Sequence, residues 1–312
     1  MKKLQFILAC AALTALSSCS SDDQSFDPNE IRITTNVGGI EATTRAATDI
    51  LSTNFSENVD NVNIYITEHA VSPTIFYGTS DLLTATAKSG NVLELSSKQY
   101  YPSTGNGVDV WGVYPTSIKR GNTTFSVKID QSNEEDYKAS DFLFAAGVTD
   151  HKKANGEINL QFEHQLSKVI VRLQAGQGVD PNALTEADVK IVNTIPKASF
   201  SALSQTAPTI SVDNTASVQE ITIGKWSGSD IAAIIVPQTV SKGTDLFKVK
   251  LANGGKYTYV IPNGDSDNDV TFSAKTVVTY TLTLTTAGIV VKSEIKDWNP
   301  GTGGSGNAVL DD

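Results

Sequence analysis

The stretch Glu157-Ile158-Asn159-Leu160-Gln161-Phe162-Glu163-His164 alternates strictly between two kinds of side chain. Charged and amide residues occupy its odd positions, while three large apolar residues and His164 occupy the even ones. Because successive side chains of a β-strand point to opposite faces, this period of two predicts a strand with one buried face. His164 lies on that face, so we expect it to be a hydrogen-bonded core histidine.

The same period recurs along the rest of the chain. Further alternating runs lie at 169–173, 247–251, 256–261 and 279–285. Clusters of Gly, Pro, Asn and Asp separate the runs, as at Gly254-Gly255. No 12-residue stretch shows a helical stripe, and the best candidate for a helical turn is 184–188. Many short strands between turns are typical of sandwiches and barrels, so we predict an all-β fold.

The composition argues against several functional classes. The 312 residues include 24 basic and 34 acidic ones, a formal charge of −10, which disfavours a nucleic-acid partner. Three histidines and two cysteines leave little material for a metal site or a disulfide framework. No G-x-S-x-G motif occurs. We therefore expect a non-catalytic protein without a metal or another cofactor.

The N-terminus predicts export. Lys2 and Lys3 precede an apolar run at 4–16, shorter than the roughly 20 residues that span a bilayer. Such a run is typical of a secretory signal peptide. The following Leu16-Ser17-Ser18-Cys19 resembles a bacterial lipobox, so we expect Cys19 to carry the lipid anchor. Ser20-Ser21-Asp22-Asp23 resembles the acidic signal that sends lipoproteins to the outer face of the outer membrane.

A processing site is predicted at Arg45. This arginine lies among small residues at 42–48, a composition expected of an exposed loop where proteases cut. Upstream, Ile31, Ile33 and Val37 share one face of a predicted strand. Cutting after Arg45 would sever this strand and uncover an apolar groove with unpaired backbone groups. A strand from another molecule could fill that groove by β-augmentation.

The chain is divided accordingly. Gly176-Gln177-Gly178 fits a boundary between two β-sandwiches of similar size. The expected parts are a lipoprotein signal peptide (1–18), a propeptide with the severable strand (19–45), an N-terminal β-sandwich (46–178), a C-terminal β-sandwich (179–300) and a flexible glycine-rich tail (301–312).

Several short motifs occur in a fixed order. They are the lipobox at Cys19, Thr-Arg-Ala at 44–46, Val-Trp-Gly-Val-Tyr-Pro at 110–115, Asp-Phe-Leu-Phe-Ala at 141–145, the strand at 162–169, Val-Pro-Gln at 236–238 and Ile-Lys-Asp-Trp-Asn-Pro-Gly at 295–301. In this order the chain resembles the fimbrillins, the pilins of type V pili in Gram-negative Bacteroidia. The resemblance covers nearly the whole precursor.

The resemblance implies two transthyretin-like Greek-key β-sandwich domains and export as a lipoprotein. It implies that an arginine-specific surface protease cuts between Arg45 and Ala46. The freed groove would then accept a strand from the C-terminal region of a neighbouring subunit. Expected partners are therefore other pilin subunits, the protease, the outer membrane through the lipid on Cys19, and a receptor on a host or bacterial surface. The final location would be the fimbrium.

Two questions stay open. After Trp298 the chain offers only a glycine-rich linker and Ala308-Val309-Leu310, which places at most two apolar side chains on one face. Either a longer piece such as 288–295 is the donor, or this subunit donates nothing and caps the tip. An alternative function is a monomeric glycan-binding lipoprotein that keeps 19–45 as a tether and uses Trp226 as a sugar platform.

Overall fold

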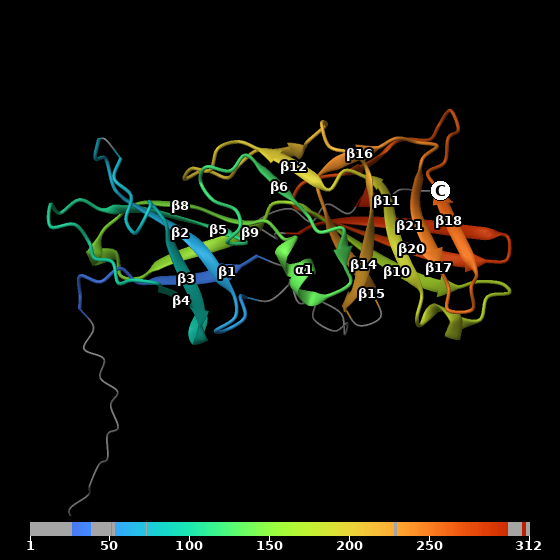
Figure 1. Ribbon diagram of the computed structural model, residues 1–312, viewed down its shortest axis with the longest axis horizontal. Coiled ribbons are helices and arrows are strands. Elements are labelled where there is room, and N and C mark those ends of the chain that lie inside the picture. Colours follow the sequence, from blue (N-terminus) through green and yellow to red (C-terminus); the bar gives the residue numbers. More distant parts are fainter. Residues whose placement is uncertain are drawn as a thin grey trace, which may run out of the picture.

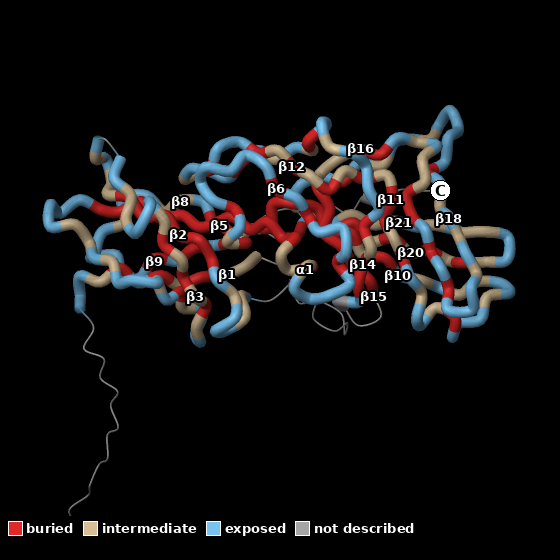
Figure 2. Tube along the Cα trace, in the orientation of Figure 1, coloured by how far each residue is buried: buried red, intermediate tan, exposed pale blue. Residues whose placement is uncertain are grey.

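The computed structural model describes residues 27–38, 51, 54–72, 74–227, 230–298 and 308–309, and this part of the chain is built almost entirely of β-strands (Figure 1). The predicted all-β fold is therefore confirmed. The strands form two main sheets, one toward each end of the elongated molecule. Each sheet has a buried apolar face, which appears as red stretches along both halves of the tube in Figure 2.

The first main sheet closes on itself. Its order is β1 (Ile33–Val37), β4 (Val92–Leu95), β3 (Leu83–Lys88), β2 (Asn61–Glu68), β5 (Val108–Tyr114), β8 (Leu143–His151) and β9 (Ile158–His164), and β9 pairs back to β1. The alternating stretch at 157–164 corresponds to β9, and Ile158, Leu160, Phe162 and His164 are all fully buried. The predicted alternation is thus confirmed, and the even-numbered side chains of β9 point into the core.

The second main sheet has ten strands. Nine follow the order β18 (Lys256–Val260), β17 (Asp245–Lys250), β11 (Asp188–Thr194), β14 (Gln219–Ser227), β15 (Asp230–Ile235), β10 (Ser167–Ala175), β20 (Thr276–Thr285), β21 (Gly288–Asp297) and β22 (Ala308–Val309). The tenth, β7 (Asp130–Gln131), pairs with β14. Two smaller sheets consist of β13 (Ile210–Val212), β12 (Lys197–Phe200) and β6 (Thr124–Ser126), and of β16 (Gln238–Val240) and β19 (Val270–Phe272).

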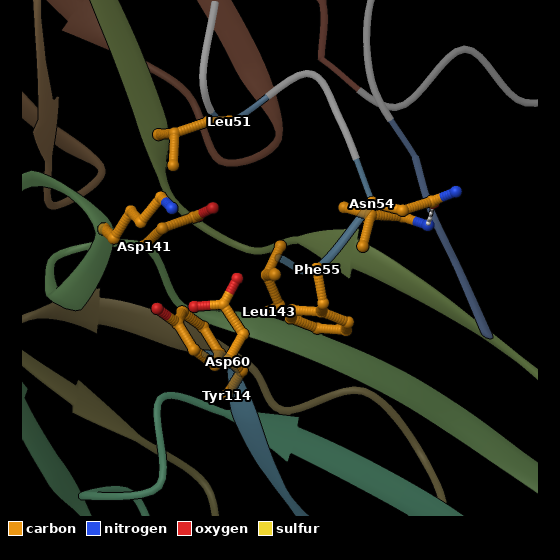
Figure 3. Close-up of a pocket in the computed structure, with 9 residues that line it drawn as sticks. Leu51, Asn54, Phe55, Asp60, Tyr114, Asp141 and Leu143 are labelled. Carbon is orange, nitrogen blue, oxygen red and sulfur yellow. Dashed lines mark hydrogen bonds between the residues drawn. The ribbon is translucent and has the colours of Figure 1, made fainter. Parts of the chain in front are cut away.

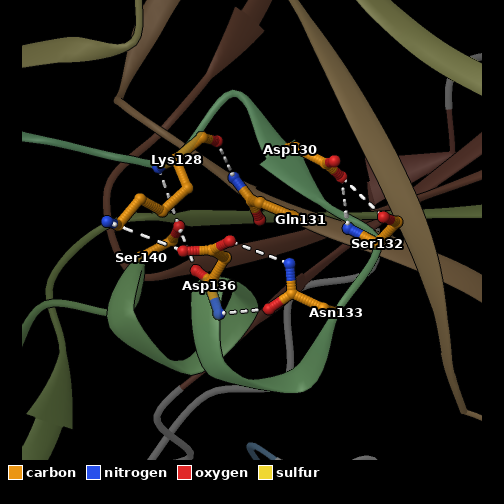
Figure 4. A network of polar contacts seen from close by, with 7 residues as sticks. All are labelled: Lys128, Asp130, Gln131, Ser132, Asn133, Asp136 and Ser140. Atoms are coloured by element: carbon orange, nitrogen blue, oxygen red, sulfur yellow. Dashed lines mark hydrogen bonds and ion pairs between the residues drawn. The ribbon is translucent and has the colours of Figure 1, made fainter.

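Helical structure in the described residues is confined to short pieces. The α-helix α1 (Glu134–Ala139) begins where the Asn133 side chain accepts a hydrogen bond from the backbone N–H of Asp136 at 2.9 Å (Figure 4). The remaining pieces are the 3-10 turns η1 (Ser89–Asn91), η2 (Lys153–Asn155) and η3 (Pro181–Leu184). None of these helices has the length and apolarity needed to span a membrane.

One sequence expectation needs correction. The helical turn expected at 184–188 is instead η3, because Asp180 caps the backbone N–H of Asn182 and Pro181 opens the turn. After β9 of the first main sheet the chain continues with β10 of the second, and the domain boundary expected near 178 stays a prediction. The glycines at 176–178 form a turn within the second sheet, where Gly176 N–H donates to the Leu284 carbonyl at 2.7 Å.

Candidate functional site: the groove filled by the first strand

The first strand lies between two strands that are distant from it in sequence. β1 pairs in parallel with β9 over five residues, from Ile33↔Ile158 to Val37↔Phe162. On its other side it pairs antiparallel with β4 at two positions. Because β1 closes the ring of seven strands, the space that it fills is a strand-shaped groove with β9 as one wall and β4 as the other (Figure 1).

One face of this segment enters the core of the first sheet. Ile31, Ile33 and Thr35 are buried, and Val37 on the same face is half-buried. The intervening Arg32 is exposed and pairs with Glu157 of the neighbouring chain segment at 3.2 Å. Burying a large aliphatic side chain contributes about 1.5–3 kcal/mol, so the groove holds this segment chiefly through Ile31 and Ile33.

The groove also holds the residues directly upstream of β1, a segment at 27–31 that we call the clasp. Here Ile31 N–H donates to the Gln99 carbonyl at 2.7 Å, and Tyr101 N–H donates to the Asn29 carbonyl at 2.9 Å. The Glu30 carboxylate pairs with Lys98 at 2.9 Å. The occupied groove is therefore longer than β1 itself, and charged residues mark its upstream end.

The downstream end of the groove is a small pocket (Figure 3). The Asn54 side chain accepts a hydrogen bond from Val37 N–H at 3.0 Å, and Gly38 N–H donates to the Phe162 carbonyl at 2.8 Å. The Phe55 ring packs edge-on against Phe162, with ring centroids 5.1 Å apart. The residues that follow the predicted cleavage site thus help to form the end wall of the groove.

Several polar groups line this pocket, among them the Tyr114 phenol and the carboxylates of Asp60 and Asp141. Burial, together with the nearby carboxylates of Asp60 and Asp141, raises the pKa of the Tyr114 phenol above its ordinary value. Tyr114 therefore stays protonated at physiological pH. In the described part of the chain, no group of three or more His, Cys, Asp and Glu residues is placed to hold a metal ion. The arrangement suits the binding of an extended strand.

The predicted site residues lie partly inside and partly outside the described part of the chain. Cys19, Arg45 and Ala46 lie outside the described residues. The backbone of Trp226 belongs to β14, and its side chain is likewise outside the described part. Ile31, Ile33 and Val37 are brought together on the core-facing side of the groove. No pattern in the sequence predicts the clasp, because its partners at 98–101 are distant along the chain.

This chain is similar to known proteins in both sequence and fold. A family model described as fimbrillin-like matches residues 44–298. The chain is 27% identical over 322 residues to a protein described as the fimbrium subunit Fim1C of Bacteroides uniformis, across 99% of this chain and 100% of that protein. Crystal structures described as cell adhesion proteins share the fold. One from Bacteroides uniformis has a TM-score of 0.64 at 20% identity, over 87% of this chain and 100% of that one. One from Bacteroides ovatus has a TM-score of 0.59 at 17% identity, over 86% and 97%.

Proposed function

The chain belongs to the fimbrillin-like family, and from that premise we propose that it is a pilin subunit of a cell-surface fimbria that serves adhesion. In this proposal the precursor is exported as a lipoprotein anchored through Cys19 to the surface-facing side of the outer membrane. An arginine-specific protease then cuts between Arg45 and Ala46. The subunits join by donor-strand exchange.

The observation that carries the proposal is the position of β1 in the first sheet. The chain enters that sheet at β1, and the next strand, β2, begins only at Asn61. Arg45 lies in sequence between the two. A cut there leaves β1 held only by non-covalent contacts, since its partners β4 and β9 belong to the rest of the chain. A strand that is both necessary to close a sheet and separable by one cut is what exchange requires.

The side-chain pattern of β21 supports this strand as the donor. Along one face of β21, the side chains of Ile289, Val291, Ser293 and Ile295 are all half-buried. Their order repeats that of the groove-filling face, which is Ile31, Ile33, Thr35 and Val37. Both sets read as two β-branched residues, a small hydroxyl residue and a third β-branched residue. A copy of β21 could therefore place matching side chains at each position of an emptied groove.

The location of β21 in its sheet also favours release. It pairs with β20 over ten residues on one side, but β22 covers only Glu294 and Ile295 on the other. In the groove, its apolar face would occupy positions that are buried, whereas at the edge of the second sheet it is half-buried. Such head-to-tail contacts do not close into a ring and so build a filament.

The test uses the chain from Ser20 onward, so that β1 is retained, treated with an arginine-specific protease. We expect a new N-terminus at Ala46 and a ladder of oligomers on unboiled gels that collapses on boiling. Arg45→Ala should stay uncut and monomeric, while Arg120→Ala, which changes an exposed arginine elsewhere, should be processed normally. Resistance of the native chain at Arg45 would contradict the pilin mechanism. Cleavage that leaves only monomer would instead support a tip subunit.

A further inference from the structure

We propose that the clasp end of the groove selects donor strands that carry a carboxylate directly before their first buried apolar residue. The selecting residue is Lys98, and the inference rests on the strand exchange proposed above. In the precursor this carboxylate is supplied by Glu30, which directly precedes the buried Ile31. The Glu30 carboxylate lies 2.9 Å from the Lys98 ammonium.

The chain between β4 and Tyr100, which forms this wall of the groove, places Lys98 beside Glu30. Ile33 pairs with Leu93, whereas Glu30 pairs with Tyr100. Three residues of the occupying strand (33 minus 30) therefore span seven of the wall (100 minus 93). The extra residues loop out between β4 and Gln99, and Lys98 is the last of them. A bulge of this kind re-aims a side chain beside a strand, which here brings Lys98 to Glu30.

The two charges differ in how far they are withdrawn from water. The Glu30 side chain is only 16% exposed, while that of Lys98 is 63% exposed. A carboxylate so far removed from solvent requires a positively charged partner. The hydrogen bond to Glu30 in turn raises the pKa of the Lys98 ammonium. A neutral side chain at this position would forgo the ion pair, and a basic one would meet Lys98 with like charge.

Two further lysines, Lys152 and Lys153, add to the preference of this end of the groove for an acidic strand. Lys153 donates a hydrogen bond to the side-chain oxygen of Asn29 at 2.7 Å. Lys152 and Lys153 line a hollow that Asp27 and Asn29 of the clasp also line. Lys152 pairs with Asp150 at 3.8 Å. Removal of residues 19–45 takes Asp27 and Glu30 from this end and leaves the lysines in place. The emptied groove would then end in excess positive charge, ready for an acidic strand.

This preference distinguishes between donors. When Ile289 is aligned with Ile31, Gly288 falls at the position of Glu30. A second copy of this chain would thus fill the apolar part of the groove without the ion pair. The favoured donor is a different subunit, whose strand reads acidic residue, β-branched residue, any residue, β-branched residue.

The experiment uses the protease-treated chain, unfolded and refolded with fluorescent peptides so that the original strand is displaced. The peptides are 27–38, its Glu30→Gln form, 286–297 and its Gly288→Glu form. On the native protein we expect Glu30→Gln to weaken binding about tenfold and Gly288→Glu to strengthen it, both effects shrinking in 1 M salt. On Lys98→Gln protein both differences should vanish, whereas Lys119→Gln, an exposed control, should behave as native.

A charge swap makes the test specific. Lys98→Glu protein should prefer a peptide 27–38 carrying Glu30→Lys over the native peptide. Equal binding of the native and Glu30→Gln peptides would overturn the selection by Lys98 and leave strand exchange intact. Failure of every peptide to bind would count against strand exchange itself, and the inference would fall with it.

Discussion

Trp298 ties the end of β21 to the first sheet. Its ring stacks on that of His164 with centroids 3.8 Å apart and planes 5° from parallel. His164 ends β9, the groove wall, and its Nδ1 lies 2.9 Å from the Asp141 carboxylate. All three side chains are buried, as the alternation of β9 predicted for His164. One aromatic contact thus joins the groove wall to the segment that follows β21.

Replacing this tryptophan should destabilise the protein strongly. We expect Trp298→Ala to lower the free energy of unfolding by about 3–5 kcal/mol, since a large aromatic side chain is lost from a packed site. Denaturation in guanidinium chloride would measure the change. Val290→Ala, at a side chain of the preceding strand that is mostly exposed, is the control and should cost less than about 1 kcal/mol. Equal losses would contradict the packing role of Trp298.

Asp213 should make stability depend on acid pH. Hydrogen bonds from the Thr215 hydroxyl, from Lys197 and from the Thr215 backbone lower the pKa of its carboxyl to about 2. Since the pKa in the unfolded chain is about 3.9, the charged form stabilises the fold above that pH, and the contribution is lost as pH falls toward 2. Asp213→Asn should therefore be less stable than the native protein at pH 7, with the difference shrinking between pH 4 and 2.

Urea titrations of both proteins at pH 7, 4, 3 and 2 would measure this difference. Asp265→Asn, at an exposed loop carboxylate, is the control because its difference from the native protein should be small. A gap between native and Asp213→Asn protein that stays constant down to pH 2 would refute the assignment.

At the scale of elements, the strands were predictable because their signal is local. The alternating runs at 247–251, 256–261 and 279–285 coincide with β17, β18 and β20 to within three residues at each end. The helix α1 was missed, although Asn133 followed by three acidic residues is a recognisable helix start. The helix has only six residues, too few to show a periodic stripe.

The pairing of the elements was not predictable from local signals. That Ile31, Ile33 and Val37 share a face follows from their spacing, but the parallel pairing of β1 with β9 joins residues 125 positions apart (158 minus 33). The Glu30–Lys98 pair likewise spans 68 positions and depends on a bulge in the wall. Such contacts depend on sheet order and register, which alternation alone leaves open.

The short strand β7 is held to β15 by the side-chain amide of Gln131, which makes the two hydrogen bonds that a neighbouring strand's backbone would make. Gln131 is fully buried, and its amide donates to the Ile234 carbonyl at 2.8 Å while accepting from Ile234 N–H at 2.8 Å. The same amide donates to the Lys128 carbonyl at 3.0 Å, at the upper side of the network in Figure 4. The Gln131 side chain thus satisfies both the backbone N–H and the backbone carbonyl of Ile234 in β15.

Gln131→Ala should therefore cost more than the removal of a single hydrogen bond. It leaves the buried N–H and carbonyl of Ile234 without these partners, and each such loss costs about 1–3 kcal/mol. We expect a loss of at least about 2 kcal/mol in chemical denaturation. The exposed Gln219→Ala should change stability by less than about 0.5 kcal/mol. A similarly small effect at Gln131 would contradict its role as a strand substitute.

At the scale of the whole molecule, the two main sheets are joined by exchanged segments. β6 and β7 precede the last strands of the first sheet in the chain, yet β6 pairs with β12 of the three-stranded sheet and β7 pairs with β14 of the second main sheet. In return, Gln205 reaches the first sheet, where its carbonyl accepts from Gly147 N–H at 2.6 Å and its side chain donates to Asp109 at 3.1 Å. Loss of β1 should therefore weaken one sheet without separating it from the other.

A chain that begins at Ala46 tests this expectation. It lacks β1 and the clasp, so β4 and β9 lose their shared partner and the core loses Ile31 and Ile33. We expect backbone hydrogen exchange to accelerate by at least about tenfold in β4 and β9, while β10 and β20 keep their protection because their pairing does not involve β1. Refolding with a peptide of residues 27–38 should restore slow exchange in both groove walls, whereas the same peptide with Ile33→Asp should not, because its charge would enter the apolar core. Uniform acceleration across both sheets would mean that the molecule unfolds as one unit, and a strand could then not be exchanged in one sheet while the other stays folded.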